Sequence, residues 1–172
     1  KFKFCIPMEN VNKIAGPFIE AWAQETFNND FEKKDNNNFF KKIEPGQRLN
    51  MADIILDFKS KNSSAIIKAN VDVKATSNDI KNSGKSPNIT SFSRIRSEYI
   101  KDPDYIFIIL SIKHRVYSKK NKKDSMMMGI MEIVDFKSYD LKYISKKDLS
   151  YNPALGTGQI QLRDIHNVSL EK

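Results

Sequence analysis

The chain has little of what several protein classes require. Cys5 is the only cysteine among 172 residues, which excludes an internal disulfide or a cysteine-based zinc site and indicates a reducing compartment. No run approaches the roughly 18 apolar residues of a membrane span, and Lys1–Pro7 is too short and too charged for a signal peptide. Internal repeats and linkers are missing too, so we expect a single domain over residues 1–172 in the bacterial cytoplasm.

Several catalytic motifs are also missing. His114 and His166 stand alone, which favours structural roles over catalysis or metal binding. The segment 156–158, Gly-Thr-Gly, is not followed by the Lys-Ser/Thr pair of a phosphate-binding loop. No aromatic-rich strand of the type that stacks single-stranded bases is present. These absences direct attention to carboxylates and lysines.

The composition is basic. Lys and Arg number 29 against 21 Asp and Glu, which gives a formal charge of +8 and a pI near 9.4. That balance favours polyanionic partners, with nucleic acid ahead of anionic membrane. The 40% hydrophobic content is typical of a folded domain with a real core.

The stretch from Ile66 to Ala75 alternates strictly between apolar and polar residues. This alternation predicts a strand with Ile67, Val71 and Val73 on a core face. Asp72 and Lys74 share the opposite face, because side chains two residues apart on a strand point the same way. A carboxylate and an ammonium group are therefore expected side by side.

A second acidic strand precedes it. Residues 52–58 predict a short strand that places Asp53 and Asp57 on one face. Phosphodiester hydrolysis needs an activated water and neutralisation of the charge that develops on phosphorus, and Mg²⁺ held by one or two carboxylates can supply both. A lysine beside the metal stabilises the negative transition state. The residues at hand for this chemistry are Asp53 or Asp57, Asp72, Lys74 and the main-chain carbonyl of Val73.

The remaining pattern predicts an α/β (α+β) domain with a mixed central sheet flanked by helices. The expected elements are helices over residues 17–28, beginning at Pro17, and 91–101, and strands over 105–112, 126–136 and 160–165. The polar stretch 76–91 predicts a long loop. The basic stretch 113–124 predicts either a solvated hairpin loop or a loop that contacts phosphates, and the methionines at 126–128 predict core packing.

The spacing Asp53 … Asp72-Val73-Lys74 resembles the PD-(D/E)XK nuclease motif, best known from type II restriction endonucleases. Eighteen residues separate the two acids, and Ala52 stands where the family often has proline. The resemblance implies a Mg²⁺-dependent enzyme that cuts double-stranded DNA at a short specific site as a homodimer. Asp53, Asp72 and the carbonyl of Val73 would hold the metal, and Lys74 would assist the attacking water.

Many members also carry a glutamate on a preceding helix. The resemblance points to Glu20, whereas the helical wheel places Glu25 on the apolar side near Phe18 and Glu20 nearly opposite Trp22. Both alternatives stay open at this point.

DNA recognition in this family comes from loops beside the catalytic strands. Side-chain types suited to phosphates and base edges occur after the second acidic strand, on the next helix and near the C-terminus. They are Ser77, Asn78, Lys81, Asn82, Lys85, Arg94, Gln159, Gln161 and Arg163. Two other functions remain open: a DNA repair or junction-resolving nuclease with the same site, and a basic nucleic-acid-binding domain without catalysis.

Overall fold

The structure is a computed structural model of the 172-residue chain. It describes residues 2–4, 6–32, 40–45, 51–59, 64–78, 86–122, 125–153, 156 and 158–171. Its elements are, in chain order, β1 (Phe2–Phe4), α1 (Met8–Glu32), β2 (Phe40–Pro45), β3 (Ile54–Lys59), β4 (Ile66–Ser77), β5 (Asn88–Ser91), α2 (Phe92–Lys101), β6 (Ile106–Lys120), β7 (Met127–Asp140), η3 (Leu141–Tyr143), η4 (Lys146–Asp148), β8 (Leu149–Asn152) and β9 (Gln159–Leu162).

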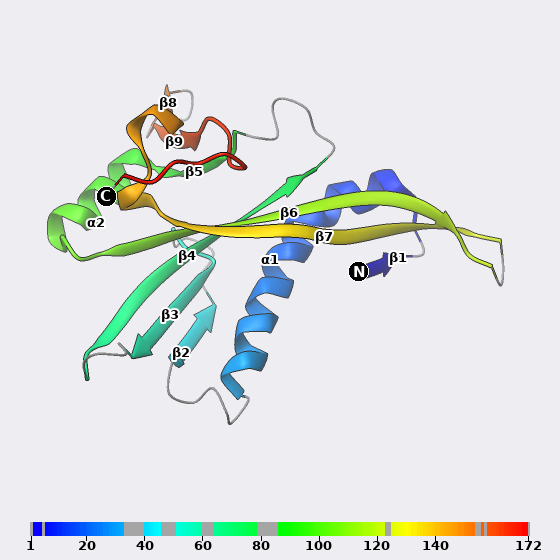
Figure 1. The fold of residues 1–172 in the computed structure, drawn as a ribbon, viewed down its shortest axis with the longest axis horizontal. Coiled ribbons are helices and arrows are strands. Elements are labelled where there is room, and N and C mark those ends of the chain that lie inside the picture. Colours follow the sequence, from blue (N-terminus) through cyan, green and yellow to red (C-terminus); the bar gives the residue numbers. More distant parts are fainter. Residues whose placement is uncertain are drawn as a thin grey trace.

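The strands form two sheets (Figure 1). The larger has six strands in the order β1-β7-β6-β4-β3-β2, and the smaller has three in the order β5-β9-β8. Only the pairing of β4 with β6 is parallel; the other pairs within the described residues are antiparallel. This mixed sheet with helices confirms the predicted α/β class. None of the described helices is both long and apolar enough to cross a membrane.

The strand predicted from the alternating pattern is β4, which runs two residues further than expected. It pairs with β3 only up to Val71, which lies opposite Ile54. Beyond that point β4 continues beside β6, with Asp72 opposite Ile109 and Lys74 opposite Ser111. The first residues after the end of the β3 pairing are therefore those of the Asp-Val-Lys motif.

Helix α1 begins nine residues before Pro17, so the prediction of a start at Pro17 was wrong. The side chains of Val11, Ala15 and Ile19 fall one helical turn apart and are buried together, which extends the helix through the proline. Gly16 lacks the Cβ that would clash with the ring of a following proline in helical backbone. Figure 1 shows the helix bending along its length, as an internal proline commonly causes.

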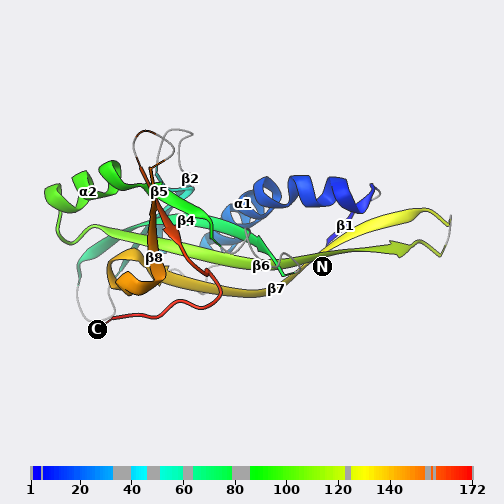
Figure 2. The same ribbon diagram turned by 90° about the horizontal axis from the view of Figure 1, so that it is seen from above.

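The core has two parts, one on each face of the large sheet. The first packs α1 against β4, β6 and β7 through Ile19, Val71 and Val73, among others. The second packs α2 and the small sheet against the opposite face through Ile95, Ile109 and Leu162, among others. Figure 2 shows α2 and the small sheet gathered near one end of β6 and β7.

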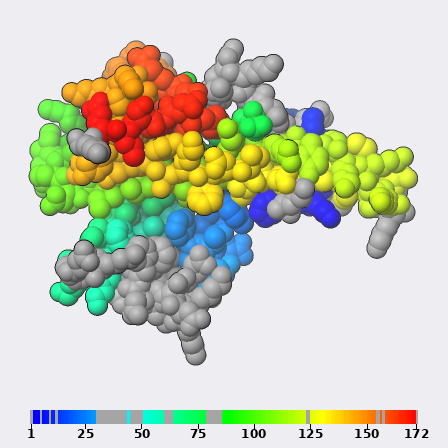
Figure 3. Space-filling view, viewed as in Figure 1, coloured from blue at the N-terminus to red at the C-terminus, as the bar shows by residue number. Residues whose placement is uncertain are grey.

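The basic stretch 113–124 was predicted as a loop, but β6 continues through it to Lys120. Its partner is β7, whose pairing extends from Ile108 opposite Asp140 to Lys120 opposite Met127. The two strands project from the body of the molecule as a long hairpin (Figure 3). The prediction that the methionine run packs in the core was wrong as well, because Met126 and Met127 lie at the exposed end of this hairpin.

The predicted loop 76–91 is shorter than expected at both ends. Residues up to Ser77 belong to β4, and residues from Asn88 belong to β5. The helix predicted over 91–101 is confirmed, with Ser91 as its N-cap residue. The short strand predicted over 160–165 is β9, which begins one residue earlier and ends at Leu162.

Candidate active site

Asp53 lies directly before β3 and joins the two acidic strands. Its main-chain N–H donates to the carbonyl of Val71 at 2.9 Å, which continues the β3–β4 ladder by one bond. Its carboxylate Oδ2 accepts the N–H of Val73 at 2.7 Å. The pairing of β3 with β4 ends at Val71, so the N–H of Val73 has no main-chain acceptor on β3. The charged carboxylate of Asp53 accepts it instead. Asp53 is thereby held beside the Asp-Val-Lys motif.

Asp72 and Lys74 form the ion pair that their spacing predicts. Lys74 Nζ donates to Asp72 Oδ1 at 2.8 Å, and the Asp72 side chain is almost fully buried. The second oxygen, Oδ2, is buried too and has no hydrogen-bond partner in the part of the chain that the structure describes. Burial raises the pKa of Asp72 to about 7, with smaller contributions from the charges of Asp53 and Glu20, while Lys74 opposes the shift.

Glu20 approaches this group from α1. Partial burial raises the pKa of its carboxyl, the charge of Asp53 adds to the shift, and that of Lys74 lowers it. The side chain still reaches solvent, so the screening there is substantial. The charge of Glu20 thus acts on Asp72, and the charges of Glu20 and Asp53 act on each other, which favours the glutamate that the resemblance implied.

The alternative first acid, Asp57, lies elsewhere. It pairs across the ladder with Lys68, four residues along β3 from Asp53. At the rise of an antiparallel strand this separation is about 13 Å. The structure thus places Asp53, rather than Asp57, next to the Asp72-Val73-Lys74 motif.

The residues present fit a hard divalent cation. No three His, Cys, Asp or Glu side chains among the described residues form a group that could hold a metal by themselves. Mg²⁺ does not need such a group, because it keeps several waters and binds through one or two carboxylates and the phosphate of its substrate. The Oδ2 of Asp72, which has no hydrogen-bond partner among the described residues, is suited to such a cation. The carbonyl of Val73 faces the same strand edge as its N–H, toward Asp53.

Comparison with known proteins decides the family. The family model described as "Type II restriction endonuclease HpaI" matches residues 1–172. The chain belongs to this family. A curated relative, the "Type II restriction enzyme HpaI" of Haemophilus parainfluenzae, is 62% identical over 167 residues, which cover 97% of this chain and 65% of the relative. The chain thus spans just under two thirds of the length of that relative. These findings confirm the resemblance to type II restriction endonucleases.

The residues predicted to contact DNA fall into three groups in this restriction endonuclease fold. Ser77 ends β4, and the N–H of Asn78 donates to the carbonyl of His114 at 2.6 Å. Arg94 lies on α2. Gln159 and Gln161 belong to β9, and Arg163 follows that strand. Lys81, Asn82 and Lys85 lie outside the described residues.

Arg163 is occupied within the protein. Its Nε donates to the carbonyl of Leu149 at 3.2 Å, and its main-chain N–H donates to the carbonyl of Asp148 at 2.9 Å. Its own carbonyl accepts the Ser86 hydroxyl at 2.6 Å. These bonds give Arg163 a structural role in holding the small sheet together, which side-chain type alone did not suggest.

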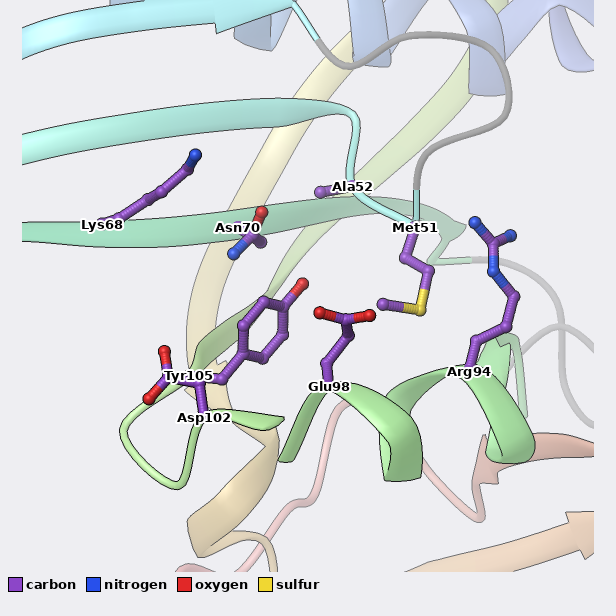
Figure 4. Close-up of a pocket in the computed structure, with 8 residues that line it drawn as sticks. All are labelled: Met51, Ala52, Lys68, Asn70, Arg94, Glu98, Asp102 and Tyr105. Atoms are coloured by element: carbon purple, nitrogen blue, oxygen red, sulfur yellow. The ribbon is translucent and has the colours of Figure 1, made fainter. Parts of the chain in front are cut away.

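A cavity that the sequence analysis missed lies between α2 and the acidic strands (Figure 4). Its volume is about 360 Å³. It is lined by Met51, Ala52, Lys68, Asn70, Arg94, Glu98, Asp102 and Tyr105. Ala52 precedes Asp53, and Asn70 shares the face of β4 with Asp72, so the cavity adjoins the candidate site. Only the position of Asn70 on the polar face of its strand could have indicated it.

Proposed function

We propose that the chain is the catalytic domain of a Mg²⁺-dependent type II restriction endonuclease. It hydrolyses phosphodiester bonds in double-stranded DNA at a short specific site. Family membership supports the class of enzyme, and the curated relative bears the name of a type II restriction enzyme. The arrangement of Asp53, Asp72 and Lys74 supports the location of the catalytic centre.

One observation above all supports this proposal. Asp53 accepts the N–H of the residue that lies between Asp72 and Lys74. Two separate segments are thereby brought together where β3 leaves the edge of β4 uncovered: one carries Asp53, and the other carries Asp72 and Lys74. An acidic strand that served only as a solvated surface would not bury Asp72 with one oxygen that accepts no hydrogen bond from any described residue.

Each side chain has a distinct task in this proposal. Asp72 and Asp53, with the carbonyl of Val73, would hold Mg²⁺. The bound ion would lower the pKa of a water molecule and neutralise negative charge on the phosphate. Lys74 is held by Asp72 at 2.8 Å, so its ammonium group is fixed where it can orient the attacking water and stabilise the pentavalent transition state. Glu20 would support the site through its charge.

The basic composition suits the DNA substrate. A net charge of +8 steers the protein toward phosphates, and Ser77, Asn78 and Arg94 are proposed to contact DNA beside the catalytic strand. Two copies of the chain, related by a twofold axis, would match a palindromic site and cut both strands. Such an enzyme would act on DNA in the bacterial cytoplasm.

The test is cleavage of a plasmid of known sequence with and without Mg²⁺. The wild type is expected to give discrete fragments only with the metal. Asp72→Ala and Lys74→Ala should each slow cleavage by about a hundredfold or more. Asp57→Ala and Lys68→Ala are matched controls, because they remove the same residue types from a facing pair on the same two strands. Equal cleavage by the wild type and both site variants would place the catalytic centre elsewhere.

A further inference from the structure

One face of the small sheet carries amides and hydroxyls, and none of the residues in its three strands is charged. In its register Asn88, Gln161 and Ser150 lie side by side in one row. A second row is formed by Ser91, Gln159 and Asn152. All six are amides or hydroxyls, in a chain of which 29% of the residues are charged, and all except the buried Ser91 are at least partly accessible. A surface of neutral donors and acceptors is suited to base edges rather than to phosphates.

The opposite face fixes the small sheet to the body of the protein. Leu162 is fully buried in the second core, and Leu149 and Ile160 pack against that core. The Ser86 hydroxyl bonds to the carbonyl of Arg163, and the N–H of Phe92 donates to the carbonyl of Gly158 at 3.1 Å. The amide face therefore lies on a rigid support, which keeps its donors and acceptors in place.

This sheet lies on the same side of the large sheet as the catalytic side chains. Val71 and Val73 point toward α1, so Asp72 between them points to the other side. There it is opposite Ile109, which is buried in one cluster with Leu162 of the small sheet. A DNA duplex bound over Asp72 and Lys74 would approach the side on which the small sheet lies.

One hydrogen bond orients the central amide. Gln161 Nε2 donates to Asn88 Oδ1 at 2.8 Å across the β5–β9 pair. The bond fixes which end of the Gln161 amide is the donor and which is the acceptor. The acceptor Oε1 and the second N–H of Nε2 then form a donor–acceptor pair of fixed direction. That pair matches the N7 acceptor and N6 amino group of adenine, whereas guanine requires two donors.

We propose that the amide face of β5-β9-β8 enters the major groove and that Gln161, oriented by Asn88, binds an adenine of the recognition site. The inference rests on the proposed restriction activity and adds to it the element that reads the sequence. The major groove admits a two-stranded β-ribbon, and Asn88 and Gln161 face each other on one such pair of strands, β5 and β9. Asn88 acts as a positioning residue, since its bond to Gln161 decides the direction of that amide.

The test uses modified bases in the cleaved sequence. The site is first found by cutting a plasmid of known sequence and mapping the ends. Each adenine of that site is then replaced in turn by 7-deazaadenine, which lacks only the N7 acceptor. For the wild type, one position per half-site should reduce cleavage roughly tenfold to a hundredfold. Gln161→Met should lose a similar factor on unmodified DNA and show no further loss at that position.

Two further variants separate orientation from folding. Asn88→Ala should reduce the discrimination at the same adenine while leaving the others unchanged. Asn29→Ala, which removes an exposed amide from α1, should cleave like the wild type at every modified position. Thermal unfolding of each variant shows whether a loss comes from an unfolded protein, and a near-isosteric Gln161→Glu variant provides a second substitution if Met unfolds it.

The possible failures are distinguishable. A wild type that cuts no duplex contradicts the proposed function itself. If the wild type cuts, but the wild type and Gln161→Met lose the same factor at each 7-deazaadenine, only the adenine contact is contradicted. Variants that become less stable without any base-selective change would assign Asn88 and Gln161 to the stability of the small sheet alone.

Discussion

The carboxylate of Asp53 accepts the main-chain N–H of Val73 at 2.7 Å, although twenty positions separate the two residues. This contact does two things at once. It satisfies a buried N–H at the point where β4 extends beyond β3, and it brings a second carboxylate next to Asp72. The same side chain therefore serves the fold and the proposed chemistry, and substitutions can separate the two roles.

Asp53→Asn should keep the hydrogen bond and lose the charge. The asparagine Oδ1 can still accept the N–H of Val73, so the free energy of unfolding should change by less than about 1 kcal/mol. Cleavage should nevertheless fall by about a hundredfold or more, because the proposed metal site would lose one of its two carboxylates. Urea denaturation and a plasmid cleavage time course measure the two effects.

Asp53→Ala removes the acceptor as well. The N–H of Val73, whose residue is almost fully buried, would then lack its partner, at a cost of about 1–3 kcal/mol. A stability equal to that of Asp53→Asn would contradict the dual role of this carboxylate.

Asp72 should make the metal-free protein less stable as pH rises. Its pKa is about 7 in the folded protein against an ordinary value of 3.8. Below about pH 3 the carboxyl is protonated in both states and costs nothing. Between pH 4 and 7 it ionises only in the unfolded chain, so stability falls, and above pH 7 the loss is constant at about 4 kcal/mol.

Asp72→Asn should remove this pH dependence. Its unfolding free energy should match that of the wild type near pH 4 and exceed it by several kcal/mol near pH 8, both measured in EDTA by urea denaturation. Asp57→Asn controls for the general loss of a carboxylate from the acidic strands. A constant difference between wild type and Asp72→Asn over this pH range would show that Asp72 ionises normally in the folded protein.

A side chain at Gly129 should destabilise the fold. An added Cβ would collide with the side chain of Val11 on α1 and lie 3.0 Å from the carbonyl of Ile6. Gly129→Ala should therefore lower the free energy of unfolding by about 1–3 kcal/mol. The control is Ser118→Ala, an exposed residue that faces Gly129 across the β6–β7 ladder, and it should change stability little. Equal stability of both variants would contradict the close packing of α1 on the hairpin.

The strand that carries the proposed site could be predicted because its signal is local. Alternation over ten residues determines which side chains share a face, and the Asp-x-Lys spacing places Asp72 and Lys74 together without knowledge of any other strand. The choice between Asp53 and Asp57 depended on where β3 ends its pairing with β4. That register is a contact between separate segments, so the sequence left both acids open.

The hairpin and the small sheet could not be predicted for the same reason. Lys119 and Lys120 are of a residue type that is common in exposed loops, and they belong to a strand only because β7 pairs with them. The hydrogen bond between Gln161 and Asn88 joins residues 73 positions apart, and no local sequence pattern predicts it. Pro17 misled the helix prediction because burial of the apolar face of α1 outweighed a local signal for a helix start.

Glu20 should matter for cleavage and Glu25 should not. The charges of Glu20 and Asp53 act on each other, and that of Glu20 also acts on Asp72, so Glu20→Gln removes negative charge from the proposed cation site. The weaker attraction should raise the Mg²⁺ concentration needed for half-maximal cleavage severalfold, and excess Mg²⁺ should restore part of the rate. Glu25→Gln, on the same helix and also exposed, is the matched control and should follow the wild-type Mg²⁺ curve. Identical curves for both variants would remove Glu20 from the site, whereas a rate lost at every Mg²⁺ concentration would assign it to a step after metal binding.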